Sequence, residues 1–280
     1  MSDSLETLRR KIDSADELGS VVRTMKALAA SGIVQYERAV RSLDDYYRTV
    51  ELGLVACMRD KEQARTSRLH ARCAVVFGSD QGLVGQYNEQ LCQFVATHSI
   101  SGDWQMLAVG ERIVAQLADA HLEVVQSFRQ PNSIAAITSL VAQILTEIEK
   151  RQCEVLLFHN RPVANSACEP VMQRLLPLDA TWQQQFSNVA WPSRNLPEVL
   201  GDATLDALIR EYLFISLYRA CAEALASENA SRLAAMQRAE KNIDELLDEL
   251  GQDYNRLRQN GIDEELFDVI SGFEALNARR

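Results

Sequence analysis

Two long segments, one at each end of the chain, carry apolar residues at alternating spacings of three and four. In the N-terminal segment this stripe consists of Leu5, Leu8, Ile12, Ala15, Leu18, Val22, Met25, Leu28, Gly32, Tyr36, Val40, Leu43, Tyr47, Val50 and Leu54. The spacing predicts one continuous α-helix with an apolar face. At a rise of 1.5 Å per residue, a helix over residues 4–58 is on the order of 80 Å long, more than a domain of this size can bury.

The C-terminal segment repeats the pattern. Its stripe consists of Leu205, Leu208, Ile209, Tyr212, Leu213, Leu217, Cys221, Leu225, Leu233, Met236, Ile243, Leu246, Leu247, Leu250, Tyr254, Leu257, Leu266, Val269, Ile270, Phe273 and Leu276. Two such stripes predict an antiparallel coiled coil, with separate bundle helices on a globular core as the alternative. Gly251, Gly261 and Gly272 each cost such a helix roughly 1 kcal/mol relative to Ala, unless they permit close approach or bending.

The middle of the chain has a different pattern and contains every proline, from Pro131 to Pro197. Short apolar runs predict strands at Cys73–Phe77, Met106–Val109, Leu122–Phe128 and Val155–His159, with an edge strand at Pro170–Pro177. Helical patterns alternate with them at Gly85–His98, Glu111–Ala120 and Ser133–Arg151. Alternation of this kind predicts a Rossmann-like α/β domain with a mostly parallel sheet. We therefore expect three segments, 1–60, 70–195 and 203–280, in which the first and last pair.

A glycine-rich stretch, VVFGSDQGLVGQYN (residues 75–88), follows the first predicted strand. Its glycines are spaced G-x-x-x-G-x-x-G, no G-K-S/T follows, and no acidic residue ends the strand Met106–Val109. These departures from the phosphate-binding motifs favour a structural strand-to-helix turn over a nucleotide site. Gly82 and Gly85 would supply positive φ and close packing, and Asp80 would cap the turn or the next helix.

Composition narrows the possible functions. The chain of 280 residues has a net charge of −10 and a pI near 5.0, which argues against a general nucleic-acid binder. Six cysteines without a C-x-x-C pair and four isolated histidines predict reduced, buried thiols and no metal site. We expect no cofactor, and no known catalytic motif is present. The opening residues lack a secretory apolar segment, and no run reaches 18 apolar residues, so any membrane association is expected through a partner.

Five ordered stretches carry a family resemblance over nearly the whole chain. They are Thr24-Met25-Lys26 with Ala29-Ala30-Ser31, Ser79 to Gly85 with Asn88, Leu175 to Leu178, Ala226 to Met236, and Tyr254 to Gln259 followed by Ile262, Glu265, Leu266 and Gly272. In this order they resemble the gamma subunit of F-type ATP synthases, the central rotor shaft. The resemblance implies that the glycine loop binds no catalytic nucleotide and that the chain is not an enzyme by itself.

The resemblance also implies partners and a mechanism. One copy of the chain would stand inside a catalytic hexamer of alpha and beta subunits, with the epsilon subunit and the membrane c-ring as further partners and no nucleic acid. Its rotation would couple ion transport to ATP synthesis or hydrolysis. The complex would lie at the cytoplasmic face of the bacterial plasma membrane, with this chain held peripherally.

Individual residues inherit expected roles from the matched motifs. Contacts with the beta subunits are implied for Met25, Lys26, Arg258, Gln259, Asp263 and Glu265. The region near the membrane ring is implied for Ser31, Glu228 and Arg232. The spacing of Glu228 and Arg232 predicts an ion pair on a helix face, worth a few tenths of a kcal/mol. Asp80, Gly82 and Gly85 are expected to be structural.

Some positions depart from the family pattern. Gln81 replaces an arginine, Val84 a cysteine, Gln86 a glycine, Asp263 a threonine, and Phe273 a small residue. These changes favour a divergent branch, such as the alternate F-type ATPases that some bacteria carry. The residues alone leave two alternative functions open: a stand-alone nucleotide-binding α/β protein with helical extensions, and a coiled-coil scaffold.

Overall fold

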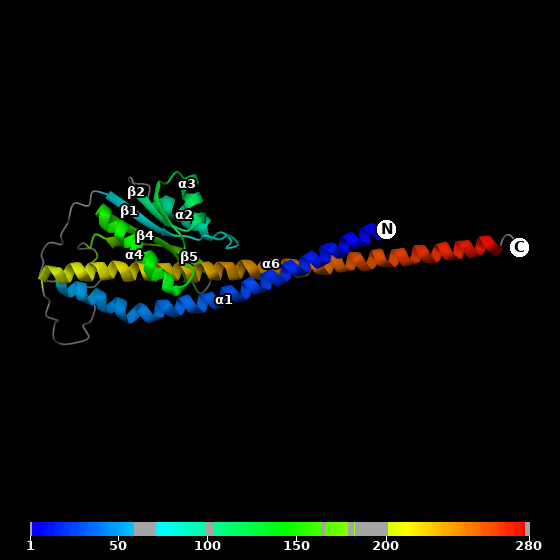
Figure 1. The fold of residues 1–280 in the computed structure, drawn as a ribbon, viewed down its shortest axis with the longest axis horizontal. Coiled ribbons are helices and arrows are strands. Elements are labelled where there is room, and N and C mark those ends of the chain that lie inside the picture. Colours follow the sequence, from blue (N-terminus) through cyan, green and yellow to red (C-terminus); the bar gives the residue numbers. More distant parts are fainter. Residues whose placement is uncertain are drawn as a thin grey trace. The chain divides into compact units, whose positions relative to one another are not determined.

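The structure, a computed structural model, describes residues 2–58, 71–98, 104–163, 166–178, 182 and 201–277. In chain order, one long helix precedes and another follows an alternating set of strands and shorter helices (Figure 1). The elements are α1 (Ser2–Met58), β1 (Ala71–Phe77), α2 (Tyr87–His98), β2 (Trp104–Val109), α3 (Glu111–Asp119), β3 (Val124–Phe128), α4 (Ile134–Arg151), β4 (Cys153–Val163), β5 (Ser166–Leu176) and α6 (Gly201–Asn277). The predicted fold class, an α/β domain with long terminal helices, is confirmed.

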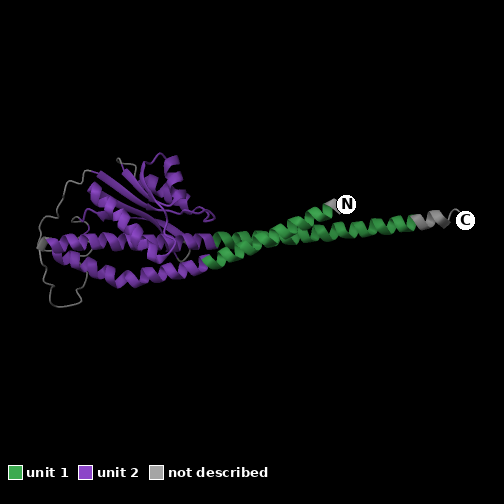
Figure 2. Ribbon diagram, viewed as in Figure 1, with its two compact units in different colours: residues 1–28, 234–280 green, residues 29–233 purple. Residues whose placement is uncertain are grey.

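The chain divides into two compact units (Figure 2). Unit 1 combines residues 1–28 with residues 234–280, and unit 2 spans residues 29–233. Both long helices therefore contribute to both units. The boundaries expected near residues 60, 70, 195 and 203 stay predictions, because residues 59–70 and 183–200 lie outside the described part of the chain.

Unit 2 contains a five-stranded sheet in the order β3-β2-β1-β4-β5. The first four strands in this order pair in parallel, and β5 pairs antiparallel with β4. Alternating side chains of β1 enter two different cores. Ala74 and Val76 pack with α2 and α3, whereas Val75 and Phe77 pack with α4 and with the parts of α1 and α6 in this unit. Helices thus cover both faces of the sheet, as parallel strands require.

The hairpin of β4 and β5 is longer than the sequence predicts. The predicted strands ended at His159 and began at Pro170, where the apolar runs stop, but the observed antiparallel ladder continues to a pair between Val163 and Ser166. Backbone hydrogen bonding carries the pairing past the polar residues beyond His159. Pro170 stands opposite Asn160 in the edge strand, a position where a missing N–H is tolerated.

The helices α1 and α6 run antiparallel within each unit. In unit 2, Tyr46 of α1 bonds Glu211 of α6, and Asp44 pairs with Arg219 farther along α6. In unit 1, the buried positions of α1 are Ala15, Gly19 and Val22. Small side chains at this contact let the helix axes approach closely.

The predicted stripe of α1 is wrong at two positions. Leu18 and Leu28 were assigned to the paired face, but their exposed fractions are 54% and 68%. The neighbouring Gly19 and Ala29 are buried instead. A Cβ added to Gly19 would lie 3.4 Å from Ile243, so the seam is built around a residue too small to register in a hydrophobic pattern.

Helix α6 continues through its glycines without interruption. A Cβ placed on Gly251 or Gly261 meets nothing within 4 Å, so among the described residues these glycines serve no close approach. All six cysteines fall in the described part of the chain and are buried thiols.

Candidate functional site: the glycine loop, its contacts with α6, and the exposed end of the helix pair

The glycine loop is held by close packing. A Cβ added to Gly78 would lie 2.3 Å from Cβ of Ile113 on α3, so no other residue fits there without displacement. Gly110 has a φ of 111°, and a Cβ added there would lie 2.7 Å from backbone atoms of Ser79. Gly85 has a φ of 61°, in the left-handed region that glycine favours. The positive φ expected at Gly82 is not found: in the loop Leu83 and Gly85 take this conformation instead. At Gly82, a Cβ would meet only the Arg112 guanidinium, at 3.4 Å.

The first three backbone N–H groups of the loop, those of Gly78, Ser79 and Asp80, have protein acceptors. The amide of Ser79 donates to Oδ1 of Asn88 at 3.0 Å, while Nδ2 of Asn88 donates to the Ser79 hydroxyl at 2.8 Å. The amide of Asp80 donates to Oε1 of Gln130 at 3.3 Å. A phosphate-binding loop needs such N–H groups to point at the ligand. Here these three N–H groups bond protein acceptors, which supports the structural interpretation of the loop.

Asp80 caps a helix, but not the one that follows it in sequence. Its Oδ1 accepts from the amide of Glu111, the first residue of α3, at 3.0 Å. The N-cap residue of α3, Gly110, has no side chain to fill this role. Oδ2 of Asp80 accepts from the amide of Gln130 at 3.1 Å. One carboxylate therefore joins the ends of β1, β2 and β3, at a helix N-terminus that favours negative charge.

Gln130 extends these contacts to α6. Its Nε2 donates to the carbonyl oxygen of Gly78 at 3.4 Å and to Oε2 of Glu228 in a short hydrogen bond. The other oxygen of Glu228 accepts from Nη2 of Arg232 at 2.5 Å. The polar contacts thus run from Asp80 through Gln130 to Glu228 and Arg232, all within unit 2.

The ion pair of Glu228 and Arg232 exists, but it is not a solvated one. The exposed fractions of the two side chains are only 5% and 12%. Burial raises the pKa of Glu228, although the charge of Arg232 and the bond from Gln130 act in the opposite direction. The few tenths of a kcal/mol expected for an exposed pair therefore do not apply, because one lost partner would leave a buried charge.

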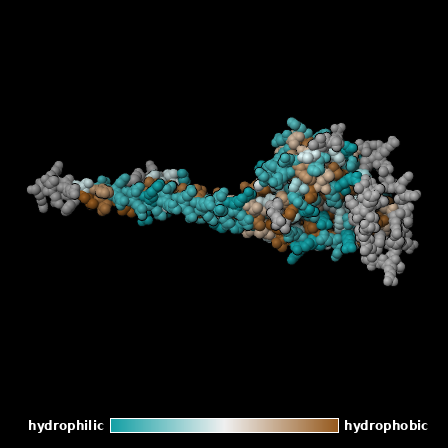
Figure 3. Space-filling model, turned by 180° about the vertical axis from the view of Figure 1, so that it is seen from behind, coloured by the Kyte–Doolittle hydropathy of each residue, from teal (hydrophilic) through white to brown (hydrophobic). Residues whose placement is uncertain are grey.

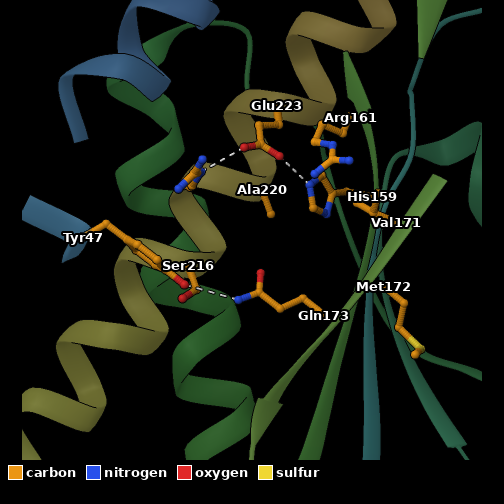
Figure 4. A pocket seen from close by; sticks show the side chains of 10 residues that line it. Tyr47, His159, Arg161, Val171, Met172, Gln173, Ser216, Ala220 and Glu223 are labelled. Atoms are coloured by element: carbon orange, nitrogen blue, oxygen red, sulfur yellow. Dashed lines mark hydrogen bonds and ion pairs between the residues drawn. The ribbon is translucent and has the colours of Figure 1, made fainter. Parts of the chain in front are cut away.

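A second polar cluster lines a cavity of about 220 Å³ between α1, α6 and the β4–β5 hairpin (Figure 4). Nε2 of His159 lies 2.8 Å from Oε2 of Glu223, and Nε of Arg219 donates to the other oxygen of Glu223 at 2.9 Å. Burial alone would raise the pKa of Glu223, but His159 and Arg219 outweigh it and lower that pKa. Gln173 donates to the hydroxyl of Tyr47 at 3.3 Å across the cavity.

The charged side chains that line the cavity already form ion pairs with each other or with neighbouring residues. Arg219 also pairs with Asp44 at 3.5 Å, and Arg161 pairs with Glu169 at 2.6 Å. Nδ1 of His159 and Oγ of Ser216 are buried without a hydrogen-bond partner among the described residues. No group in this lining is arranged as a nucleophile beside a base, which acyl-transfer chemistry would require.

Unit 1 has its own small core. Val22 of α1 packs with Met236 and Ile243 of α6, and Met25 borders this cluster half-buried. Nζ of Lys26 lies 2.5 Å from Oε2 of Glu240. Met25 and Lys26, two predicted contact residues, are therefore partly engaged in holding the two helices together.

The other predicted contact residues lie farther along α6 on exposed helix. Arg258, Gln259, Asp263 and Glu265 are all exposed. Eighteen residues separate Glu240, the partner of Lys26, from Arg258, which corresponds to about 27 Å of helix. The structure does not bring Lys26 and Arg258 together, and it places Ser31 on an exposed position of α1 in unit 2.

Large apolar side chains are exposed on the same stretch of α6. They are Ile262, Leu266, Phe267, Val269 and Ile270, with exposed fractions from 44% to 69%. Figure 3 shows hydrophobic side chains gathered near the carboxyl end of this helix. A helix with this many exposed large apolar residues is typical of a surface that another protein covers.

Sequence reasoning missed Gln130, Tyr87 and Asn160. Their side chains are used for contacts across the fold: the hydroxyl of Tyr87 donates to the carbonyl of Ala224 at 3.0 Å, and Asn160 donates to the carbonyl of Tyr87 at 3.1 Å. No local pattern identifies such residues, since their partners lie far away in sequence. The described residues contain no group of side chains able to hold a metal ion, and none of their helices is long and apolar enough to span a bilayer.

Comparisons with known proteins agree over nearly the whole chain. The model of the ATP synthase family matches residues 4–276. An ATP synthase gamma chain of Moorella thermoacetica is 29% identical over 97% of this chain and 99% of its own length. An ATP synthase gamma chain of Pelagibacter ubique is 26% identical, and the match covers 98% of this chain and 99% of that one.

Solved structures with this fold were also found. A chain of the Euglena gracilis mitochondrial ATP synthase, from a structure of OSCP, F1 and c-ring, has a TM-score of 0.74. It is 16% identical, and the match covers 99% of this chain and 96% of that one. A central-stalk and c-ring structure from Tetrahymena thermophila gives a TM-score of 0.57 at 20% identity, covering 78% of this chain and 99% of that one. At these identities the likeness concerns the fold.

Proposed function

The chain belongs to the ATP synthase family as a gamma chain, and we propose that it is the central-stalk rotor that transmits torque between a membrane ion-translocating ring and the catalytic subunits. The observation that carries this proposal is the exposed apolar end of α6, next to an antiparallel helix pair in unit 1. A paired helix resists torsion, and an uncovered apolar end needs a surrounding protein. The chain itself is a non-catalytic subunit and takes no cofactor.

The proposed partners are the alpha and beta subunits, the epsilon subunit and the membrane c-ring, with one copy of this chain per complex. The names of the Euglena structure, F1 and c-ring, support this set by analogy. Rotation would present a different face of the helix pair to each beta subunit. This couples shaft angle to catalytic state through differential contacts with each conformation of that subunit.

The beta-subunit contacts are proposed for two places. Arg258, Gln259, Asp263 and Glu265 form the distal group, on α6 beside the exposed apolar residues. Met25 and Lys26 form the second group, where α1 pairs with α6. The 27 Å of helix between them, about five turns, means that they would meet different levels of the surrounding subunits.

The three residues predicted to lie near the membrane ring differ in how exposed their side chains are. Ser31 has an exposed side chain that a partner can reach, whereas Glu228 and Arg232 bond each other inside unit 2. We therefore assign the direct contact to the surface near Ser31, with Glu228 and Arg232 fixing α6 behind it. The whole complex is membrane-associated, and the bacterial origin of the curated relatives supports the cytoplasmic face of the plasma membrane, with the chain held peripherally.

Co-expression with alpha and beta subunits from the same source tests the proposal. The expected product is a complex of three alpha, three beta and one gamma chain, identified by native mass, that hydrolyses ATP. A chain that stays monomeric and binds ATP would contradict the rotor function and favour the nucleotide-binding alternative. A chain that only self-associates would favour the scaffold.

The distal contact group can be tested within that complex. Arg258→Ala is expected to lower ATP hydrolysis or ATP-driven ion pumping. Arg256→Ala is the matched control, because two residues rotate a helix by about 200° and place Arg256 on the other side. Arg256 pairs with Asp253 at 3.0 Å. Equal effects of both substitutions would contradict a specific contact at Arg258.

A further inference from the structure

One face of α6 receives polar contacts from the α/β part of unit 2. Five residues of α6 form this face, and each bonds one residue of the α/β part. The pairs are Glu223 with His159, Ala224 with Tyr87, Ser227 with Asn160, Glu228 with Gln130, and Ser231 with Cys168. The spacings of one, three, one and three keep these positions on one side of the helix. Five separate points of the domain thus engage about two turns of α6.

Gln130 differs from the other four partners because its side-chain amide alone contacts both the start of the glycine loop, at Gly78 and Asp80, and α6, at Glu228. Its amide oxygen accepts from the amide of Asp80, and its two amide hydrogens serve Gly78 and Glu228. Its backbone amide donates to the Asp80 carboxylate at 3.1 Å. The hydrogen-bonding capacity of this one side chain is therefore divided between the loop and the helix.

This geometry joins two sequence motifs that are far apart. Asp80 belongs to the glycine-rich stretch, and Glu228 and Arg232 belong to the stretch Ala226 to Met236. Gln130 is 50 residues from Asp80 and 98 residues from Glu228 in the chain. The glycine loop has a structural role here, because Asp80 bonds Gln130 through both its backbone amide and its carboxylate and so sets the position of Gln130 against α6.

Apolar packing and hydrogen bonding resist different movements. The apolar residues between the sheet and α6 are attracted without preferred direction, so they oppose separation more than sliding or turning. A hydrogen bond to a buried carboxylate depends on distance and angle, and its loss leaves a charge unsatisfied. The polar face of α6 therefore fixes the rotational setting of the helix against the domain.

We propose that Gln130 is a positioning residue that locks α6 to the α/β domain, so that torque applied to the domain reaches the helix without slip. This inference rests on the proposed rotor function. It assigns the Asp80–Gln130–Glu228 contacts to coupling rather than to ligand binding or to catalysis.

The test compares Gln130→Met with Gln126→Met in the assembled, membrane-bound complex. Methionine keeps the approximate length of the side chain and removes its hydrogen bonds, and Gln126 is an exposed residue of β3 that serves as the matched control. Two rates are measured on the same vesicles: ATP hydrolysis, and ATP-driven ion uptake. For Gln130→Met we expect hydrolysis to be retained while the ratio of ion uptake to hydrolysis falls severalfold; for Gln126→Met the ratio should not change.

A Gln130→Met complex with the normal ratio would overturn the inference while leaving the rotor function intact. Failure of the unsubstituted chain to assemble or pump would instead contradict the rotor function, and the inference with it. A purely structural role would lower hydrolysis and uptake in proportion through loss of assembled complex, and the ratio would stay constant.

A reciprocal exchange covers the case in which Gln130→Met does not assemble. Gln130→Glu alone places a second carboxylate against Glu228. Adding Glu228→Gln re-forms that one contact with donor and acceptor exchanged, while the bond to the Gly78 carbonyl and the ion pair with Arg232 stay lost. We expect the single substitution to lower the ratio and the double substitution to restore part of it. A double variant no better than the single one would contradict a direct role for this contact.

Discussion

Lys26 of α1 and Glu240 of α6 form an ion pair across the helix pair of unit 1, with Nζ 2.5 Å from Oε2 although 214 residues separate them. The two side chains keep exposed fractions of 36% and 22%, so solvent screens their attraction. We expect a double-mutant cycle with Lys26→Met and Glu240→Gln to give a coupling of about 1 kcal/mol or less. Urea unfolding of the full chain measures it. A coupling of several kcal/mol would show that the pair is shielded from water.

Glycine substitutions at two sites should have opposite effects. In Gly78→Ala, the new Cβ meets Ile113 at 2.3 Å, so we expect a loss of about 1–3 kcal/mol in the free energy of unfolding. In Gly251→Ala, nothing lies within 4 Å and the helix gains about 1 kcal/mol. Denaturant unfolding of both variants tests the pair. Tolerance of alanine at Gly78 would show that the loop can move away from α3.

The pKa of Glu223 lies below its ordinary value because His159 and Arg219 together outweigh the effect of burial. An acid with a lowered pKa contributes stability above its ordinary pKa of about 4.5 and loses it as the pH falls through the folded-state value. The loss of stability caused by Glu223→Gln, relative to the unsubstituted chain, should therefore be largest near neutral pH and become smaller in acid. Thermal unfolding across this range measures it, and a constant deficit would contradict the shift.

Glu228 should show the opposite pH dependence. Burial raises its pKa, so the folded chain holds a proton that the unfolded chain releases, and stability falls as the pH rises above about 4.5 through the raised pKa. The stability of Glu228→Gln relative to the unsubstituted chain should thus increase with pH. The same thermal unfolding series serves both variants, and slopes of equal sign would be inconsistent with these two environments.

Phe267 is 66% exposed on α6, so its replacement should separate folding from assembly. We expect Phe267→Ser to change the free energy of unfolding of the chain by only about 0.5 kcal/mol. Binding to the alpha and beta subunits should weaken clearly, as measured by copurification at limiting gamma chain. Lys241→Ser, at a side chain 77% exposed on the same helix, is the control. Unchanged assembly of the Phe267 variant would argue that no partner covers this residue.

Most of the elements could be predicted from sequence, because each rests on local periodicity. The strand Cys73–Phe77 and the helix Ser133–Arg151 fall within a few residues of β1 and α4. The helix ends carry readable signals: Ser133 accepts from the amide of Ala136, and Gln152 takes the left-handed conformation that closes α4. Periodicity failed at Leu18 and Leu28, where small neighbours form the seam instead of the larger apolar residues.

The candidate site was predictable only where a motif marked it. Asp80 and Glu228 stand in recognisable stretches, but nothing in either stretch indicates that Gln130 connects them. The ion pair of Glu228 and Arg232 was predicted, but its small expected energy was not, because a spacing of four places residues on a helix face without telling whether that face is covered. Contacts over 98 residues depend on topology, which local patterns do not contain.

The burial of all six cysteines has a practical consequence for watching this chain move. None of them is more than 8% exposed, and burial raises the pKa of Cys92, Cys168 and Cys221, which keeps these thiols protonated. Thiol reagents react with accessible thiolates. A single cysteine introduced at the exposed Gln126, outside the proposed partner contacts, would therefore take up a fluorophore or a bead tether selectively, with every native cysteine left in place.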